Sequence, residues 1–311
     1  MRRLPLLLLL TSLPLALLCL LAVTSRWWFP GEIGANCSLH AALMLLPAVI
    51  VWRRSSTVAG GLLLCMLLGL SPWFRSAWEQ RATLPSAEAP QIRVASANLY
   101  LYNHERTAAV ASVMAQEADI VVMVESISSE DRAHVPVDRY PNQIWQPQPD
   151  RKWRDCVVLL SAYPIIWQQS YDLEVQPYLA ATLDVKGRPL HVIAVHTVSP
   201  ESPERTVERN DQLQRISQTI RQLQAANPAP VLLMGDWNLT VGSAAWHDLH
   251  QNGGVLRAAQ REPSSWPWFL GPLGITIDHI MGRGLALGPQ HAYIIRGSDH
   301  RGMSGSLQFL P

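Results

Sequence analysis

The sequence predicts a group of membrane-spanning helices followed by a soluble domain of mixed strands and helices. Leucine is crowded into the first 75 residues, whereas most of the charged residues follow Glu79. Beyond about residue 90, short apolar runs of strand length alternate with longer segments of helical periodicity. The 311 residues are therefore divided into a membrane part and a soluble domain.

Three apolar segments near the N-terminus have the composition of bilayer-spanning helices. They cover about residues 4–23, 35–52 and 58–74, and the first contains no charged residue. The second and third are near the lower length limit, and Pro47 and Gly69 could kink them. We expect all three to cross the membrane.

The first apolar segment does not look like a cleaved signal peptide. Arg2 and Arg3 resemble the start of one, but the apolar run is long for that role and no clean cleavage site follows. We therefore expect residues 1–80 to form a retained anchor and residues 81–90, which contain two prolines, to form a stiff linker. Residues 91–311 then form the soluble domain.

The basic residues of the anchor predict its orientation. If all three helices cross, one side holds four arginines, Arg2, Arg3, Arg53 and Arg54, and this side is expected to be cytoplasmic. The opposite side also holds arginines, namely Arg26, Arg75 and Arg81, so the bias is modest. Tryptophans lie near the helix ends, as interfacial aromatics do: Trp27, Trp28, Trp52 and Trp73. The soluble domain is then expected outside the cytoplasm.

Composition limits the function classes. A net charge of +1 and a charged fraction of 16% provide no strong electrostatic footprint for nucleic acid. The compact basic run 151–154 could line a nucleic-acid groove or be a solvated loop. Cys19, Cys37, Cys65 and Cys156 do not form a disulfide framework, and the lack of a CxxC pair excludes zinc-ribbon and thioredoxin-like sites.

The soluble domain contains a series of expected strands and two clear helices. The helices cover 107–116 and 204–224. The strands are expected at 92–98, 119–125, 157–160, 164–167, 179–185, 190–197, 231–234 and 274–281, with a last one near 306–309.

Strand after strand in this domain ends in, or is followed by, a polar residue. The residues with this placement are Asn98, Glu125, His196, Asp236, Asn238, Asp278, Asp299 and His300. A carboxylate at the end of a buried strand is costly unless it is paired or bound to a metal. So many such ends suggest one shared site at one edge of a sheet assembly.

Asp236 and Asn238 follow the apolar run that begins at Val231. One interpretation is an Asx turn that caps the strand. The other is that both side chains project to the same side of an extended chain and hold a water, a metal or a phosphate. The polar ends of the other strands favour the second interpretation, with Trp237 pointing the other way into the protein.

The acidic residues suit metal-assisted hydrolysis of a phosphate ester. Glu125 and Asp299 are hard oxygen ligands of the kind that Mg²⁺ prefers, with Asp299 as the second ligand. Such a metal polarises a phosphoryl oxygen and stabilises the leaving group. Asp236 could orient or deprotonate the attacking water.

The amides and histidines complete this hypothesis. Asn98 and Asn238 can donate hydrogen bonds to the phosphate without adding charge. His196 and His300 can donate to the developing negative charge and transfer protons, and His196 can also bind the phosphate. Asp278 would hold His300 through a ring N–H bond and raise its pKa.

Taken singly, these residues also have structural interpretations. Glu125 could be a solvated loop residue, and His196 could be a core histidine. His279 lies on the opposite face of its strand from Asp278, which favours a structural role for the histidine.

The ordered motifs resemble those of the endonuclease/exonuclease/phosphatase superfamily, which has the DNase-I-like fold. The motifs are Ala97-Asn98, Val124-Glu125, Val158 to Ile165, Val195 to Thr197, Gly235 to Asn238, Ile277 to Ile280 and Gly297 to His300. The resemblance implies an α/β (α+β) four-layer αββα sandwich, dependence on Mg²⁺ (Mn²⁺ could replace it) and hydrolysis of phosphate esters. It carries Glu125 over as metal ligand.

Two further motifs resemble a bacterial membrane-anchored branch of this superfamily. They are 265–267 and 209–213, and they imply a multi-pass protein of the bacterial inner membrane with a periplasmic domain. Some positions depart from the superfamily pattern. Tyr100 replaces an aspartate usual in abasic-site nucleases, Ala162 replaces a common arginine, and Gly302-Met303 replaces the usual Pro-Val or Pro-Ile.

The sequence thus favours a membrane-anchored, Mg²⁺-dependent phosphoesterase. Its substrate is expected to be a phosphodiester, either nucleic acid or a lipid or head-group diester, and its other partner is the lipid bilayer. The alternative is a non-catalytic, membrane-tethered binding or scaffold module that keeps the fold. A serine hydrolase is disfavoured because no GxSxG motif is present. Nothing in the sequence indicates an oligomeric state.

Overall fold

The computed structural model describes residues 3–87, 90–147, 155–171, 176, 178–260 and 262–310. The chain divides into two compact units. The helical unit comprises Met1–Glu79, Pro200–Val207 and Leu239–Asp248, and the sandwich unit comprises Gln80–Ser199, Glu208–Asn238 and Leu249–Pro311. The basic run 151–154 lies outside the described residues.

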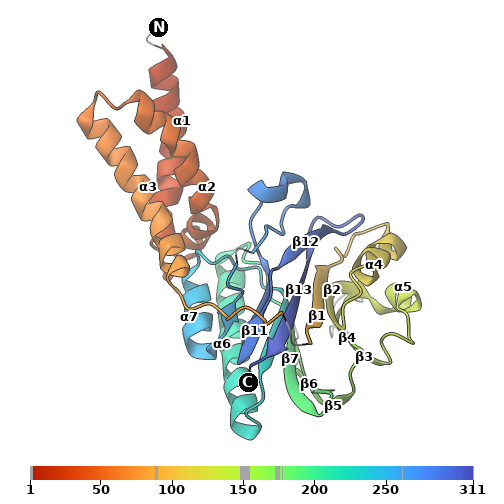
Figure 1. Ribbon diagram of the computed structural model, residues 1–311. Coiled ribbons are helices and arrows are strands. Elements are labelled where there is room, and N and C mark those ends of the chain that lie inside the picture. Colours follow the sequence, from red (N-terminus) through yellow and green to blue (C-terminus); the bar gives the residue numbers. More distant parts are fainter. Residues whose placement is uncertain are drawn as a thin grey trace. The chain divides into compact units, whose positions relative to one another are not determined.

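Three helices form the first part of the helical unit and pack against one another (Figure 1). They are α1 (Arg3–Ala22), α2 (Phe29–Val51) and α3 (Ser56–Ala77). By length and composition α2 and α3 could cross a membrane, and α1 is apolar over Leu8–Ala22, the part whose side chains the structure describes. Two long apolar helices near the N-terminus are therefore present, as predicted.

Helix α2 begins earlier than residue 35, where its apolar pattern was expected to start. The glycines in its first turns are contact positions. A Cβ atom on Gly31 would lie 2.5 Å from the carbonyl carbon of Thr24, and one on Gly34 would lie 2.7 Å from the backbone nitrogen of Ala22. The glycines therefore let α2 pack closely on the end of α1.

The segment 239–248 also belongs to the helical unit. Thr240 donates from its hydroxyl to Asn36 Oδ1 at 2.7 Å, and Ser243 donates to Glu32 Oε2 at 2.8 Å. Glu32 is buried, with 1% of its surface exposed. These bonds give α2 polar partners near its N-terminal end.

The sandwich unit contains two mixed β-sheets. In the first the strand order is β11-β13-β1-β2-β4-β3, with β12 paired to β13. In the second the order is β5-β6-β7-β8-β10-β9. Only β1–β2 and β7–β8 are parallel neighbours among the described pairs; the others are antiparallel. The first sheet is built from β1 (Ile92–Asn98), β2 (Ile120–Ile127), β3 (Asn142–Pro147), β4 (Asp155–Ser161), β11 (Leu285–Leu287), β12 (His291–Ile294) and β13 (Arg301–Phe309). The second is built from β5 (Ile165–Tyr171), β6 (Tyr178–Val185), β7 (Arg188–His196), β8 (Val231–Asp236), β9 (Leu256–Arg257) and β10 (Asp278–Arg283).

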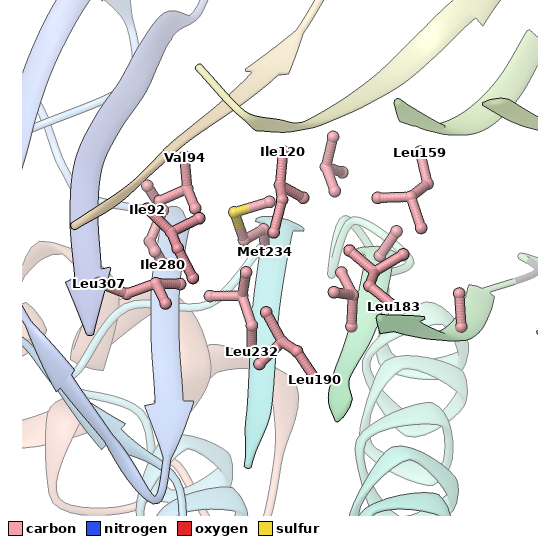
Figure 2. Close-up of a cluster of buried hydrophobic side chains, with 14 of the residues drawn as sticks. Ile92, Val94, Ile120, Leu159, Leu183, Leu190, Leu232, Met234, Ile280 and Leu307 are labelled. Carbon is pink, nitrogen blue, oxygen red and sulfur yellow. The ribbon is translucent and has the colours of Figure 1, made fainter. Parts of the chain in front are cut away.

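The main core lies between the two sheets (Figure 2). Strand β1 shows how the sequence builds it, because alternate side chains of a strand face opposite ways. Ile92 and Val94 face the second sheet, where Leu232 and Met234 belong to the same cluster. The small Ala95 and the following alanine at 97 face the other side and join a separate cluster.

Helices cover the outer faces of both sheets. On the first sheet, α4 (Arg106–Met114) contributes Val110 and Val113 to the cluster beneath it. On the second, α6 (Pro203–Ala226) buries Ile216 and Ile220, and its Thr219 hydroxyl pairs with that of Tyr178 at 2.8 Å. The four layers, helix, sheet, sheet and helix, confirm the predicted αββα sandwich of the DNase-I-like type.

Several elements differ from their expected bounds. The strand expected at 274–281 begins at Asp278, and the last strand begins at Arg301 rather than near 306. The remaining short elements were not expected: α5 (Ser128–Asp131), η1 (Arg132–His134), α7 (Ala244–Gly253), η2 (Trp268–Leu273) and the strands β3, β9, β11 and β12. All four cysteines are free, as predicted.

Candidate active site

The strand order brings the polar strand ends together. The parallel pairs β1–β2 and β7–β8 end on the same edge, and β10 begins there because it runs antiparallel to β8. Asp236 at the end of β8 is directly opposite both His196 on β7 and Asp278 on β10. The first sheet contributes Asn98 and Glu125, which lie within hydrogen-bond or ion-pair range of the second sheet's residues.

Glu125 is positioned by a β-bulge. The register of β2 against β4 shifts between Met123 and Ser126, and Glu125 has a positive φ of 52°. Bulges and left-handed residues re-aim side chains, at a cost that proteins accept mainly at functional sites. Here the bulge directs the carboxylate to the backbone N–H of Leu101, which donates to Oε2 at 2.7 Å.

Asn98 joins the carboxylates of the two sheets. Its side-chain nitrogen donates to Glu125 Oε1 at 2.9 Å and to Asp236 Oδ2 at 3.0 Å. Its Oδ1 accepts from the backbone N–H of Tyr100. The residue is fully buried, so these bonds hold both acids in fixed positions.

The pKa of the Glu125 carboxyl lies below its usual range. Burial alone would raise this pKa, but the charge of His196 and the hydrogen bonds from Asn98 and Leu101 outweigh burial. His196 Nε2 lies 3.6 Å from Glu125 Oε1. Glu125 is therefore ionised at neutral pH and suited to bind a cation.

His300 lies between two buried aspartates. Its Nδ1 is 2.8 Å from Asp278 Oδ2, and its Nε2 is 3.7 Å from Asp236 Oδ2. Burial lowers the pKa of His300, but the charge and hydrogen bond of Asp278 raise it more strongly, to about 10. His300 is therefore a cation at neutral pH with a defined ring orientation.

The pKa of Asp236 is also raised. Burial and then the neighbouring charge of Asp278 raise its pKa to about 7, and the charge of His300 offsets this only in part. A carboxyl group whose pKa is close to the operating pH can both accept and release a proton.

His196 and Asn238 line the same edge but are held differently. Gln176 places its Nε2 2.6 Å from His196 Nδ1, which leaves Nε2 facing the acids. Asn238 has a positive φ of 44°, its backbone N–H donates to Asp236 Oδ1, and its side-chain amide donates to the carbonyl of Thr197 at 2.9 Å. The strand ends at Asp236, so the extended conformation does not continue and an Asx turn forms there.

Gly235 allows the end of β8, which carries Asp236, to lie very close to β7. Its φ is 139°, and a Cβ atom would lie 1.8 Å from the carbonyl oxygen of Val195. Only glycine fits this position.

Asp299 precedes β13 and is held by the loop that precedes β10. Trp266 donates from Nε1 to Asp299 Oδ2 at 3.0 Å, and the backbone N–H of Trp268 donates to the Asp299 carbonyl at 2.9 Å. Among the described residues, Asp299 Oδ1 is buried without a hydrogen-bond partner, and so is Asp278 Oδ1. Buried oxygens without a partner are the kind of atoms that a bound cation satisfies.

The described residues contain one group with the spacing of a metal site. Asp236, Asp278 and His300 each offer a ligand atom within 4.8 Å of the others. This set differs from the predicted pair, Glu125 and Asp299.

Several supporting residues were not identified from the sequence. Ser298 donates to the Asn98 carbonyl and accepts from the His300 N–H, and Ser265 Oγ accepts from the Asp278 N–H. Both lie inside motifs that the sequence displays. Gln176 is an isolated glutamine, and no pattern around it signals its contact with His196.

A family model for endonucleases, exonucleases and phosphatases matches residues 95–300, which include the polar strand ends described above. The chain belongs to the endonuclease/exonuclease/phosphatase family. No curated protein has a significant sequence match.

Solved structures of this family share the fold. An endonuclease/exonuclease/phosphatase from Bacteroides vulgatus is 16% identical, covers 71% of this chain and 100% of its own, and superposes with a TM-score of 0.59. The human Nocturnin catalytic domain is 16% identical, with 71% and 95% coverage and a TM-score of 0.57. Sphingomyelinase C from Streptomyces griseocarneus is 19% identical, with 70% and 99% coverage and a TM-score of 0.54. In each case the match covers nearly all of the other chain.

Proposed function

We propose that the protein is a membrane-anchored, metal-dependent phosphodiesterase. The observation that carries the proposal is the buried arrangement of Asp236, Asp278 and His300, in which one acid has a pKa near neutrality and the histidine is cationic. A binding or scaffold module would not require these costly buried charges. Membrane anchoring rests on α2 and α3, with α1 as a third crossing.

The site suits a divalent cation. Mg²⁺ prefers carboxylate oxygens to imidazole, so we assign Glu125 and Asp299 as its ligands and keep His300 for proton transfer. The ionised Glu125 and the partnerless Asp299 Oδ1 support this choice. When bound, Mg²⁺ supplies Lewis-acid polarisation of a phosphoryl oxygen and charge neutralisation at the leaving oxygen. Mn²⁺ offers the same chemistry.

The side chains of the protein then bind the phosphate and move the protons. Asp236 accepts a proton from the attacking water, since its pKa of about 7 leaves a large carboxylate fraction at neutral pH. His300 donates from Nε2 to the developing negative charge, and Asp278 holds its ring. Asn238 and His196 bind the phosphate oxygens. Asn98 was expected to bind them too, but its side-chain nitrogen already donates to Glu125 and Asp236, so we assign it the role of holding these acids in place.

This proposal is tested with the detergent-solubilised full-length protein and bis-p-nitrophenyl phosphate. We expect hydrolysis with Mg²⁺ or Mn²⁺ and none in EDTA. Glu125→Gln removes a charged ligand but keeps the side chain's shape, so kcat should fall by roughly 100-fold or more. Glu117→Gln, at a position 66% exposed, is the matched control and should be unaffected. Activity that survives both EDTA and Glu125→Gln would refute the assignment.

For the substrate we propose a phosphodiester with an apolar part, such as a lipid. The supporting feature is an aromatic loop, residues 266–273, whose backbone and indole bind Asp299. Its apolar side chains are exposed: Trp268 by 47%, Phe269 by 68%, Leu270 by 43% and Leu273 by 69%. Exposed apolar groups beside a polar site are suited to hold acyl chains while the phosphate reaches the acids.

The double variant Phe269→Ser/Leu273→Ser tests the substrate proposal. Hydrolysis of a phospholipid diester in mixed micelles should fall about tenfold, equivalent to about 1.4 kcal/mol of lost apolar contact, while hydrolysis of bis-p-nitrophenyl phosphate stays unchanged. Val137→Ser is the control, because Val137 is 66% exposed and lies outside the loop. Equal rates on micelles for the double variant and wild type, or faster cleavage of single-stranded DNA than of lipid, would contradict it.

A further inference from the structure

The helical unit contains a cavity of about 330 Å³. Its walls come from the turn between α1 and α2, from the last turns of α3, and from the segment that begins at Gly242. All of the lining residues belong to the helical unit. None of them is a residue of the candidate active site.

The described residues that line this cavity include basic side chains and no acidic ones. Arg26 and Arg75 both line it, and they are two of the arginines that depart from the charge bias of the anchor. Arg26 is paired with Asp248 through two bonds, of 2.7 and 3.1 Å. Among the described residues, Arg75 has no ion pair or hydrogen-bond partner for its guanidinium, so its charge is available to an anion.

His247 adds a buried nitrogen that has no partner. The residue lines the cavity and is 2% exposed. Its Nδ1 is hydrogen-bonded to Glu79 Oε1, which as a carboxylate oxygen can only accept, so Nδ1 carries the proton. Its Nε2 is buried and, within the described part of the chain, has no hydrogen-bond partner. With the proton on Nδ1, Nε2 can only accept, so a hydroxyl group of a ligand would provide its partner.

The same end of the helix bundle carries exposed tryptophans. Trp27, Trp28 and Trp78 are 74%, 52% and 88% exposed. Tryptophan gathers at the level of the lipid head groups, where its apolar ring and its N–H are both satisfied. If the helices span the membrane as proposed above, the cavity therefore lies at head-group depth.

We propose that this cavity binds the phosphate group of an anionic phospholipid. Arg75 donates to the phosphate, a hydroxyl group of a head group such as that of phosphatidylglycerol donates to His247 Nε2, and the depth supplies the lipid. A lipid bound there would fix the end of α3 to the turn after α1 without taking part in hydrolysis. The inference rests on the proposed membrane placement and is independent of the proposed hydrolase activity.

Native mass spectrometry of the full-length protein in detergent and EDTA tests this binding. With phosphatidylglycerol added, we expect one retained lipid per chain. Arg75→Gln should weaken retention by about tenfold, because a charged hydrogen-bond donor to the phosphate is lost. Arg75 makes no described pair within the protein, so this change is expected to leave folding intact. Arg53→Gln, at the opposite end of the bundle, is the matched control and should retain lipid like the wild type.

Three results would overturn the proposal. They are equal retention by Arg75→Gln and wild type, equal retention of diacylglycerol, which has no phosphate, and Arg75-dependent binding of inorganic phosphate without any retained lipid. Hydrolysis of bis-p-nitrophenyl phosphate by Arg75→Gln, measured separately with Mg²⁺, should match the wild type. An inactive wild-type enzyme that retains lipid would refute the hydrolase and leave the lipid site standing.

Discussion

Asp278 controls the protonation of two neighbours through its negative charge. After burial, it is the largest cause that raises the pKa of Asp236, and it also supplies the largest contribution that raises the pKa of His300. The first shift brings a base close to neutrality, and the second keeps an acid charged. The Asp278 carboxylate thus sets Asp236 up as a base and His300 as an acid.

Asp278→Asn should move the whole pH–rate profile to lower pH. Without the negative charge of Asp278, the pKa of Asp236 falls, so the acidic limb of the kcat/KM profile moves to lower pH. The pKa of His300 also falls, so the basic limb shifts down too. The rate at the optimum should drop roughly 100-fold, since His300 loses its charged hydrogen-bond partner.

Initial rates with bis-p-nitrophenyl phosphate between about pH 5 and pH 10 measure these limbs. Asp138→Asn, at an exposed position, is the control and should reproduce the wild-type profile. A limb that moves to higher pH in Asp278→Asn would disprove the role assigned to this carboxylate.

Asn98, His196 and Asp236 of the candidate site could be predicted because each one ends a recognisable strand. The backbone conformations that place these side chains could not be predicted. Glu125 and Asn238 both adopt a positive φ, which carboxylate and amide side chains in strand-like sequence do not signal. The Asp-x-Asn pattern was consistent with either a turn or a site, and Asp236 takes part in both.

At the scale of elements, strand β10 is tied to β9 by a buried ion pair. Glu262 Oε2 accepts from Arg257 at 2.9 Å, and its Oε1 lies 3.3 Å from His279 Nδ1. Burial would raise the pKa of Glu262, but His279 and Arg257 together lower it to about 2. The same strand carries Asp278, so this pair supports an element of the candidate site.

Glu262→Gln should destabilise the protein by an amount that depends on pH. A fall in pKa from 4.5 to about 2 corresponds to about 3 kcal/mol, at 1.36 kcal/mol per unit. Because the folded pKa is depressed, this stability is fully present above about pH 4.5 and is lost as the pH falls toward 2. The difference in unfolding free energy between wild type and variant should therefore shrink across that window.

Urea-induced unfolding of the detergent-solubilised protein, followed by tryptophan fluorescence, provides these free energies. Glu117→Gln, whose carboxylate forms an exposed pair with Arg93, should cost little at any pH. A difference between Glu262→Gln and wild type that stays constant from pH 7 to about pH 2.5 would exclude the linkage.

The sequence predicted the longer elements better than the short ones for a physical reason. Apolar periodicity marks helix α6 and the buried strands, whereas β13 opens with Arg301-Gly302 and contains a further glycine at 305, a composition that does not favour a strand. Pairing with β1 overrides that local preference, because Ser304 and Met303 lie in register with its residues. Such tertiary effects do not appear in a local pattern.

At the scale of the whole molecule, the order of the strands explains how residues 200 positions apart meet. Ser298 binds the Asn98 carbonyl across that separation. The predicted four-layer sandwich required this convergence, and the structure provides it. The grouping of 239–248 with the N-terminal helices had no sequence signal, since it depends on single contacts such as Ser243 with Glu32.

If the N-terminal helices span a membrane as proposed, the number of crossings decides which compartment holds the sandwich. When α2 and α3 both cross, or both fail to cross, they leave parity unchanged, and α1 then determines the side. It is 20 residues long with Pro14 inside, and the sequence has no charged residue from Leu4 to Ala22. If α1 crosses with Arg2 and Arg3 in the cytoplasm, residue 86 lies outside.

A reporter fused after Ser86 tests this arrangement in a bacterial host. We expect alkaline phosphatase at this position to be active and a reporter that folds only in the cytoplasm to be inactive. The same pair of reporters placed after Trp52 should give the reverse result, because that turn joins α2 to α3 on the side of Arg53 and Arg54. Cytoplasmic signal after Ser86 would overturn the three-crossing arrangement, and would place the acids of the site in contact with cytoplasmic rather than external phosphodiesters.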